Sequence, residues 1–172
     1  SLYITSDLST SGNVTIANLG LDIPFTVTAN EITTVDIPRT ARLDEEGISK
    51  NGIHVTALNP VVVYAHIYAN NVSGATLCLP TSTLGKEYYS INYKQVSNEE
   101  PAYSFFFAVA TEDNTRLEII PAATTLNGWQ PGNTYSVVLN KGEIYQVLSK
   151  TDLTGSVIRS VGTCKKIAVY SG

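Results

Sequence analysis

The 172-residue chain has no methionine and few of the residues that usually carry chemistry. It contains two cysteines, two histidines and one tryptophan, and only 15% of its residues are charged. No C-x₂-C or H-x₃-H spacing is present, which argues against a zinc site, and no G-x-S-x-G motif marks a nucleophile. The acidic clusters at 44–46 and 112–114 lack the calcium-loop pattern and are interpreted as solvated loops. The sequence therefore predicts a protein that is not an enzyme and that uses no metal or cofactor.

Clustered positive charge and long apolar runs are also missing. The formal net charge is −4, and Lys165 and Lys166 form the only adjacent basic pair. Nucleic-acid binding relies on clustered Lys or Arg, so we expect no nucleic-acid partner and no attraction to an anionic membrane surface. No apolar run approaches the roughly 20 residues of a transmembrane helix, so we expect no membrane insertion.

Strand signals dominate what is present. Val, Ile, Thr, Tyr and Phe form short runs bounded by Gly, Asn, Pro and Asp, with turns about every ten residues. The segment 40–49 is the best helix candidate, and it offers one turn that Gly47 would end. The pattern predicts an all-β protein with almost no helix. The predicted strands lie near 2–6, 13–18, 24–29, 32–37, 52–57, 61–69, 75–79, 87–93, 104–111, 115–120, 134–139, 143–149, 156–160 and 166–170.

An internal repeat indicates how these strands are organised. Residues 24–38 and 52–64 return as 133–149 and 155–170, and the matching positions are apolar strand residues and turn residues. A repeat of this kind predicts a duplicated multi-stranded unit. We expect an antiparallel β-sandwich or jelly-roll-like architecture in which the copies bury their apolar faces against each other.

The domain organisation follows from the same repeat. We expect a single β domain over residues 1–172, with repeats at about 2–69 and 104–171 joined by an insert over 70–103. The runs VVVYAHIYA (61–69) and SFFFAVA (104–110) are apolar on both faces. Such runs are typical of central strands that are covered on both sides.

One strand carries a row of candidate ligand-binding residues. Strand alternation places Tyr64, His66 and Tyr68 on one face, with Val63, Ala65 and Ile67 on the other. The row could line a ligand groove, or its rings could pack in the interior with their polar tips on neighbours. A second histidine, at position 54 in the preceding strand, could face the same region.

The single tryptophan, Trp129, is the other candidate. It lies in LNGWQPGN (126–133), which the turn residues mark as a loop. A loop tryptophan can stack on a sugar or anchor a protein partner, because its ring gives a large contact area. The alternative is that it folds back over a sheet edge.

Cys78 and Cys164 each lie in an apolar setting. In an exported protein they could form one disulfide. The alternative is two buried thiols, which is a common state for cysteine.

A series of motifs resembles a known family. NGIHVTALNPVVVY, LPTSTLGKEYY, AVATEDNTRLEII, LNKGEIYQV and the closing LTGSVIRS and CKKIAVYSG segments are similar to the IgGFc-binding protein N-terminal domain family. The CKKIAVYSG ending points toward the bacterial, Bacteroidetes-type branch of that family. The resemblance implies an extracellular, non-enzymatic β domain used in adhesion or protein binding, and it supplies no catalytic residues.

Together these features predict a non-catalytic extracellular or cell-surface binding module of a larger protein, with a protein or glycan ligand. The alternatives are a carbohydrate-binding module that uses Trp129 and exposed tyrosines, an architectural spacer, or a hydrolase with an unrecognised site. A protein-binding module predicts an exposed apolar patch. A hydrolase predicts a deep pocket with perturbed pKa values near one of the histidines.

Overall fold

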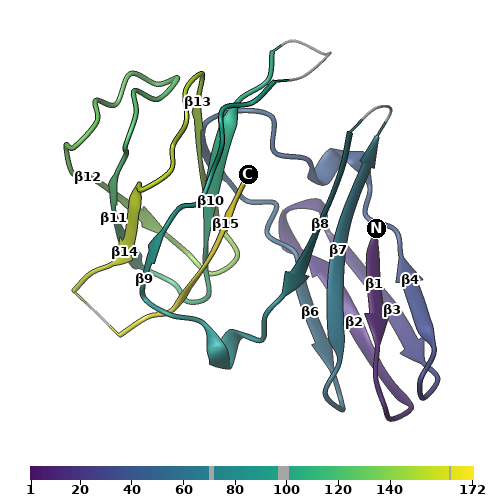
Figure 1. The fold of residues 1–172 in the computed structure, drawn as a ribbon. Helices are drawn as coiled ribbons and strands as arrows, with labels where there is room; N and C mark the ends of the chain where they lie inside the picture. The colour runs from purple at the N-terminus through teal and green to yellow at the C-terminus, as the bar shows by residue number, and fades with distance from the viewer. Residues whose placement is uncertain (70–71, 97–100, 163) are drawn as a thin grey trace. The chain divides into compact units, whose positions relative to one another are not determined.

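The structure is a computed structural model that describes residues 1–69, 72–96, 101–162 and 164–172 (Figure 1). Within these residues, fifteen strands form four sheets, and all of their pairings are antiparallel. The helical segments of the described residues are three short 3₁₀ turns, at Ala17–Leu19, Arg39–Ala41 and Thr81–Thr83. The prediction of an all-β fold with almost no helix is confirmed.

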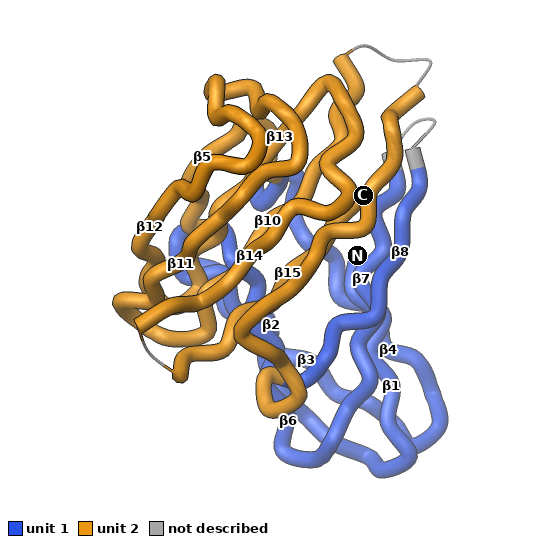
Figure 2. The backbone as a smooth tube through the Cα atoms, turned by 60° about the vertical axis from the view of Figure 1, so that its left-hand side comes forward, with its two compact units in different colours: residues 1–42, 51–80 blue, residues 43–50, 81–172 orange. Residues whose placement is uncertain are grey.

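The chain divides into two compact units, which are coloured separately in Figure 2. Unit 1 comprises residues 1–42 and 51–80, and unit 2 comprises residues 43–50 and 81–172. The segment 70–103, expected to be an insert, is shared between the two units. The single-domain description stays a prediction, and each unit is described by itself below.

Unit 1 contains two sheets. Sheet A has the strand order β4-β1-β7-β8, and sheet B has the order β3-β2-β6. The strands are β1 (Leu2–Thr5), β2 (Thr10–Ile16), β3 (Leu21–Val27), β4 (Ile32–Val35), β6 (His54–Ala57), β7 (Val62–Ala69) and β8 (Val72–Cys78).

Unit 2 also contains two sheets. Sheet C has the order β15-β10-β13-β5, and sheet D has the order β12-β11-β14-β9. The strands are β5 (Gly47–Ser49), β9 (Glu87–Tyr89), β10 (Ser104–Ala110), β11 (Thr115–Ile120), β12 (Tyr135–Leu139), β13 (Ile144–Ser149), β14 (Val157–Ser160) and β15 (Ile167–Ser171).

The two units repeat one topology. In unit 1, β1 lies between β4 and β7, and β2 lies between β3 and β6. In unit 2, β10 lies between β13 and β15, and β11 lies between β12 and β14, with the same order along the chain. The predicted duplication is therefore present in the fold. The copies differ at their edges, because unit 1 adds β8 whereas unit 2 adds β5 and β9.

Each unit closes its own hydrophobic core between its two sheets. Ile4 of sheet A and Val14 of sheet B are fully buried in unit 1, and Phe106 of sheet C and Leu117 of sheet D are fully buried in unit 2. Burying such side chains contributes about 1.5–3 kcal/mol each. The apolar faces thus meet within a unit, which corrects the expectation that the two copies bury them against each other.

The segment 40–49 departs from its predicted helical turn. A 3₁₀ turn ends at Ala41, and Gly47 begins a strand, with a φ of 130° that residues with a Cβ rarely adopt. β5 pairs with β13 through Gly47 opposite Gln146 and Ile48 opposite Tyr145. The local sequence carries no strand pattern here, because this strand exists through pairing with residues far along the chain.

Candidate functional site

The aromatic row of β7 lies on the outer side of sheet A. Val63 and Ala65 face the core of unit 1, so alternation directs Tyr64, His66 and Tyr68 outward. Tyr64 is 46% exposed and Tyr68 is 75% exposed. The prediction of one shared face is confirmed. The expectation that this strand is covered on both sides is wrong.

Neighbouring strands extend this outer face. Tyr3 of β1 and Leu77 of β8 both lie opposite Tyr64 in the strand register. The His66 ring lies 5.9 Å from the Tyr3 ring and 6.3 Å from the Tyr68 ring, measured between centroids. We call this surface the aromatic face. It comprises Tyr3, Ile32, Val62, Tyr64, His66, Tyr68 and Leu77.

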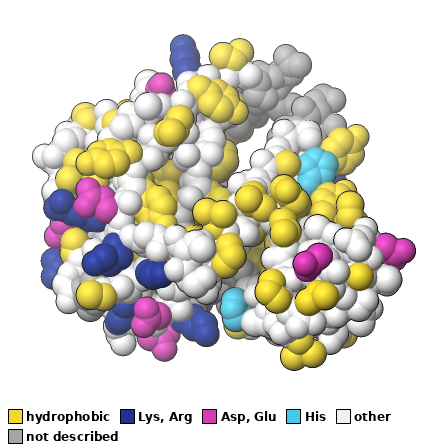
Figure 3. Space-filling model, turned by 60° about the horizontal axis from the view of Figure 1, so that its bottom comes forward, with side chains coloured by type: hydrophobic (Ala, Val, Ile, Leu, Met, Phe, Trp, Pro, Cys, Tyr) yellow, Lys and Arg dark blue, Asp and Glu magenta, His cyan; other side chains and the backbone are white. Residues whose placement is uncertain are grey.

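Charge is scarce around the aromatic face. None of the charged residues of unit 1 lies in β1, β7 or β8. In the view of Figure 3, dark-blue basic side chains gather over unit 2, whereas unit 1 shows yellow apolar side chains together with magenta acidic ones. An exposed apolar patch without charge is the kind of surface that protein partners cover. The charged residues of unit 1 are Asp7, Asp22, Glu31, Asp36, Arg39 and Arg42.

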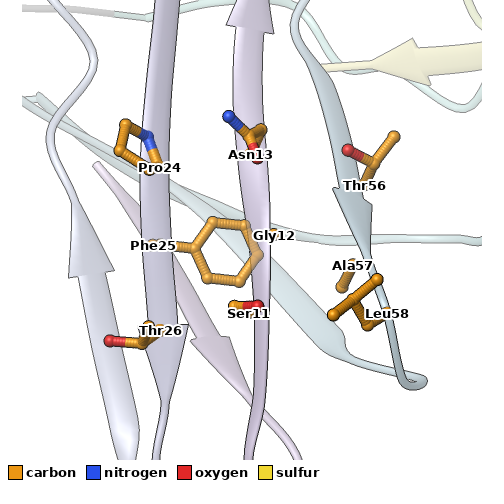
Figure 4. Close-up of a pocket in the computed structure, with 9 residues that line it drawn as sticks. All are labelled: Ser11, Gly12, Asn13, Pro24, Phe25, Thr26, Thr56, Ala57 and Leu58. Carbon is orange, nitrogen blue, oxygen red and sulfur yellow. The ribbon is translucent and has the colours of Figure 1, made fainter.

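A hollow of about 610 Å³ lies on sheet B of the same unit (Figure 4). The Phe25 ring lies across Gly12, where an added Cβ would come within 2.7 Å of the ring and 2.0 Å of the Thr56 carbonyl oxygen. Glycine is therefore required at this position. The hollow is lined by Ser11, Gly12, Asn13, Pro24, Phe25, Thr26, Thr56, Ala57 and Leu58, a set without an acid, base or thiol.

The two histidines do not share a site. His54 lies in β6 of sheet B, where its neighbour Val55 faces the core, whereas His66 lies in β7 of sheet A. The two side chains therefore point away from opposite sides of unit 1, and the expectation that they face one region is wrong. His66 Nε2 lies 3.1 Å from Ser73 Oγ, a contact within sheet A.

Trp129 is held within unit 2. Its ring stacks on Tyr135 at a centroid distance of 4.3 Å and on Tyr145 at 5.3 Å, with interplanar angles of 2° and 6°. The loop is closed by the Thr125 N–H, which donates to the Trp129 carbonyl oxygen at 3.0 Å. The half-buried indole packs against the core of unit 2, so its stacking surface is already occupied by tyrosine.

Tyr145, Asp152 and Arg159, which all lie in unit 2, have shifted pKa values. Each shift has a local structural cause. Burial, and secondarily the charge of Glu46, raise the pKa of Tyr145 to about 12. Hydrogen bonds from Thr154 lower the pKa of the Asp152 carboxyl. The Arg159 guanidinium donates to Glu118 Oε2 at 2.8 and 3.0 Å across β11 and β14, and this raises the pKa of Arg159. None of these groups lines the hollow in sheet B.

Glu46 has a structural role that the sequence did not reveal. Its Oε2 accepts hydrogen bonds from the backbone N–H groups of Leu126, Asn127 and Leu148, at 2.9, 3.3 and 3.3 Å. The interpretation of 44–46 as a solvated loop is therefore wrong for this residue. An adjacent trio of acids gives no sign that one member binds the backbone of a distant loop.

The cysteines lie in different units. Cys78 ends β8 and is partly buried against the core of unit 1, whereas Cys164 is exposed in unit 2. The structure does not join them by a disulfide. The disulfide stays a prediction, which the mass of the protein with and without reductant can test.

Metal-ligand clusters and membrane-spanning helices are both absent from the described ranges. No group of three or more His, Cys, Asp or Glu side chains in them is placed to hold a metal ion. Within the same ranges, no helix has the length and apolar character needed to span a bilayer.

Comparison with protein families gives a match. A family model described as IgGFc binding protein matches residues 74–172. This region contains most of β8 and all of unit 2 except residues 43–50, so β1 to β7 lie outside it. Comparison with curated proteins and with solved structures gives no match.

Proposed function

Because the chain belongs to the IgGFc-binding protein family, we propose that it is a non-catalytic, protein-binding module of a larger extracellular or cell-surface protein. The family match covers more than half of the chain. The family description supplies the class of function, namely binding of a protein. The identity of the ligand and the bacterial origin stay predictions.

The aromatic face is the observation that carries this proposal. Three exposed tyrosines at positions 3, 64 and 68 share one side of sheet A with exposed aliphatic residues, and none of the four strands of this sheet contains Asp, Glu, Lys or Arg. Tyrosine is enriched at binding hot spots, because its ring buries a large area at low entropic cost while its hydroxyl can hydrogen-bond. The face lies on a sheet rather than on loops, so the contact residues are held in place by the core beneath them.

The alternatives receive less support. A carbohydrate module that used Trp129 would need a free ring face, and this ring stacks on Tyr135 and Tyr145. A hydrolase would need titratable groups around a cavity, and the lining of the hollow in sheet B has none. An architectural spacer does not require an exposed apolar patch, so that function would not explain the patch on sheet A.

Binding to an array of immobilised extracellular proteins tests the proposal, with the Fc fragment of immunoglobulin G as its first member and a glycan array in parallel. We expect a protein signal that falls at least about tenfold, or about 1.4 kcal/mol, in the double variant Tyr64→Ala/Tyr68→Ala. Tyr93→Ala is the matched control, since Tyr93 is 61% exposed and lies in unit 2.

The outcomes separate the candidate functions. A signal confined to glycans and lost in Trp129→Ala would replace the proposal with the carbohydrate module. A protein signal that the double variant retains would leave the family-level function intact and remove the aromatic face as its site.

A further inference from the structure

Strand β8 lies at the edge of sheet A. Its side that faces away from β7 pairs with no other strand of the described residues. It pairs with β7 along its whole length, and the sheet order places no strand beyond it. Residues 73–77 are all exposed. β8 and β3 are the longest edge strands of the described sheets, at seven residues each.

The register shows which backbone groups of β8 face outward from the sheet edge. The Ser1 amino group donates to the His66 carbonyl oxygen at 3.0 Å, and the His66 N–H donates to the Ser1 carbonyl oxygen at 3.0 Å. His66 therefore bonds toward β1. Alternate residues of an antiparallel strand bond to alternate sides, so Ala75, opposite His66, directs its N–H and C=O away from β7. Ser73 and Leu77 follow the same alternation.

This edge lacks the features that usually prevent edge pairing. Proteins protect open edges with charge, proline, bulges or very short strands. The equally long edge strand β3 carries Asp22 and Pro24, whereas the segment Ser73–Leu77 has neither charge nor proline. In unit 2, β13 and β14 are each covered by an added strand, β5 and β9. β8 therefore differs from the protected edges of the same protein.

We propose that β8 pairs antiparallel with β8 of a second copy of this chain, about a two-fold axis at Ala75. In this register Ala75 faces its own symmetry mate and Ser73 faces Leu77. All three carry outward N–H and C=O groups, which gives about six hydrogen bonds between the copies. A two-fold interface requires one patch to complement itself. This strand satisfies that requirement, because no like charges oppose each other and the central side chains are small.

The pairing would also join the two aromatic faces. The side chains of Ser73, Ala75 and Leu77 lie on the same side of sheet A as Tyr64, His66 and Tyr68. Two copies paired at β8 form one continuous sheet, with an aromatic face on each half. The dimer itself needs no other ligand, so it can be tested independently of the proposed binding function.

Sedimentation velocity over a wide concentration range tests the dimer. Ala75→Pro removes the outward donor without touching a bond to β7, and Ala75→Lys sets two ammonium groups opposite each other at the axis. We expect a reversible dimer for the unmodified chain. Each variant should raise its dissociation constant at least about tenfold, and the Lys variant should recover partly at high salt.

A matched control and a cross-link define the register. Ile32→Lys adds the same charge at the opposite edge of the outer side of sheet A and should leave the dimer unchanged. With Cys78 and Cys164 replaced by serine, Ala75→Cys should form a symmetric disulfide, since directly opposed Cα atoms lie about 5.5 Å apart. Gly74→Cys would face Thr76 of the partner and should not cross-link.

Three results would overturn the proposal. The first is an unmodified chain that sediments as a monomer at every concentration. The second is a dimer that both Ala75 variants leave intact while circular dichroism shows them folded. The third is a dimer that only Ile32→Lys dissociates, which would place the contact at the other edge of the sheet.

Discussion

At the scale of single residues, Trp129 shows how a loop residue becomes part of a core. The turn signals around it predict a loop correctly, but its partners Tyr135 and Tyr145 come from β12 and β13 in different sheets. Sequence spacing cannot show that these two rings meet the indole. The structure favours the predicted alternative in which the ring folds back onto the sheets.

Replacing this indole should cost stability rather than binding. Truncation of a well-packed tryptophan costs about 3–5 kcal/mol, and a half-buried ring should lie near the lower end of that range. We therefore expect Trp129→Ala to lower the free energy of unfolding by about 3 kcal/mol, measured by urea denaturation. Trp129→Phe should lose less, because a ring remains to stack. An alanine variant as stable as the parent would contradict the stack.

The raised pKa of Tyr145 predicts a loss of stability in alkali. The unfolded phenol ionises near its ordinary value of 10.0, whereas the folded phenol ionises near 12. Between these values the unfolded state has lost the proton that the folded state still holds, so unfolding becomes more favourable as pH rises. Below pH 10 both states are protonated, and this contribution is fully present.

The measurement is the free energy of unfolding from pH 9 to 12 for the parent and for Tyr145→Phe. The parent should lose stability relative to Tyr145→Phe progressively above pH 10. Parallel pH profiles would show that the buried phenol has an ordinary pKa.

At the scale of secondary-structure elements, local pattern predicts most strands and fails where pairing is remote. The alternation in TRLEII predicts β11 at its observed bounds, whereas the alternation in FTVTA predicts β3 with a start three residues late. The sequence does not predict β5, because only three residues form this strand and its partner β13 lies in the other half of the chain. Alternation likewise predicts that Tyr64 and Tyr68 share a face. It cannot show whether another layer covers that face.

The attachment of β5 to unit 2 depends on Glu46. Glu46→Ala would leave the Asn127 and Leu148 N–H groups without their acceptor, at a cost of about 1–3 kcal/mol. Hydrogen exchange should become faster at these two amides, whereas the Leu126 N–H keeps its bond to the Leu148 carbonyl oxygen at 2.9 Å. Glu45→Ala, an exposed neighbour, should leave these amides protected. Equal exchange in both variants would contradict the role assigned to the Glu46 carboxylate.

At the scale of the whole molecule, duplication has given two units with different surfaces. Unit 2 carries most of the charge, two added edge strands and nearly all of the family match. Unit 1 carries little charge, an open edge at β8 and the aromatic face. The internal repeat predicts the common topology. It cannot predict this division, because the repeated positions are those that build the cores.

Because each unit has its own core, we expect a core substitution to destabilise only the unit that contains it. Ile4→Ala and Phe106→Ala each remove a fully buried side chain, at a cost of about 2–5 kcal/mol. We expect Ile4→Ala to accelerate hydrogen exchange in β1, β2 and β7, and Phe106→Ala to accelerate it in β10, β11 and β13. Exchange that rises equally in both units for either variant would contradict the separate cores.

The most direct test of the aromatic face is site-specific photo-cross-linking with benzoylphenylalanine at position 64, 68 or 93. The probe is any protein that binds the unmodified chain on the array, beginning with the Fc fragment. The account predicts cross-links from positions 64 and 68 of β7 and none from position 93, although Tyr93 is also well exposed. Cross-links from position 93 alone would place the binding surface on unit 2 and contradict the account.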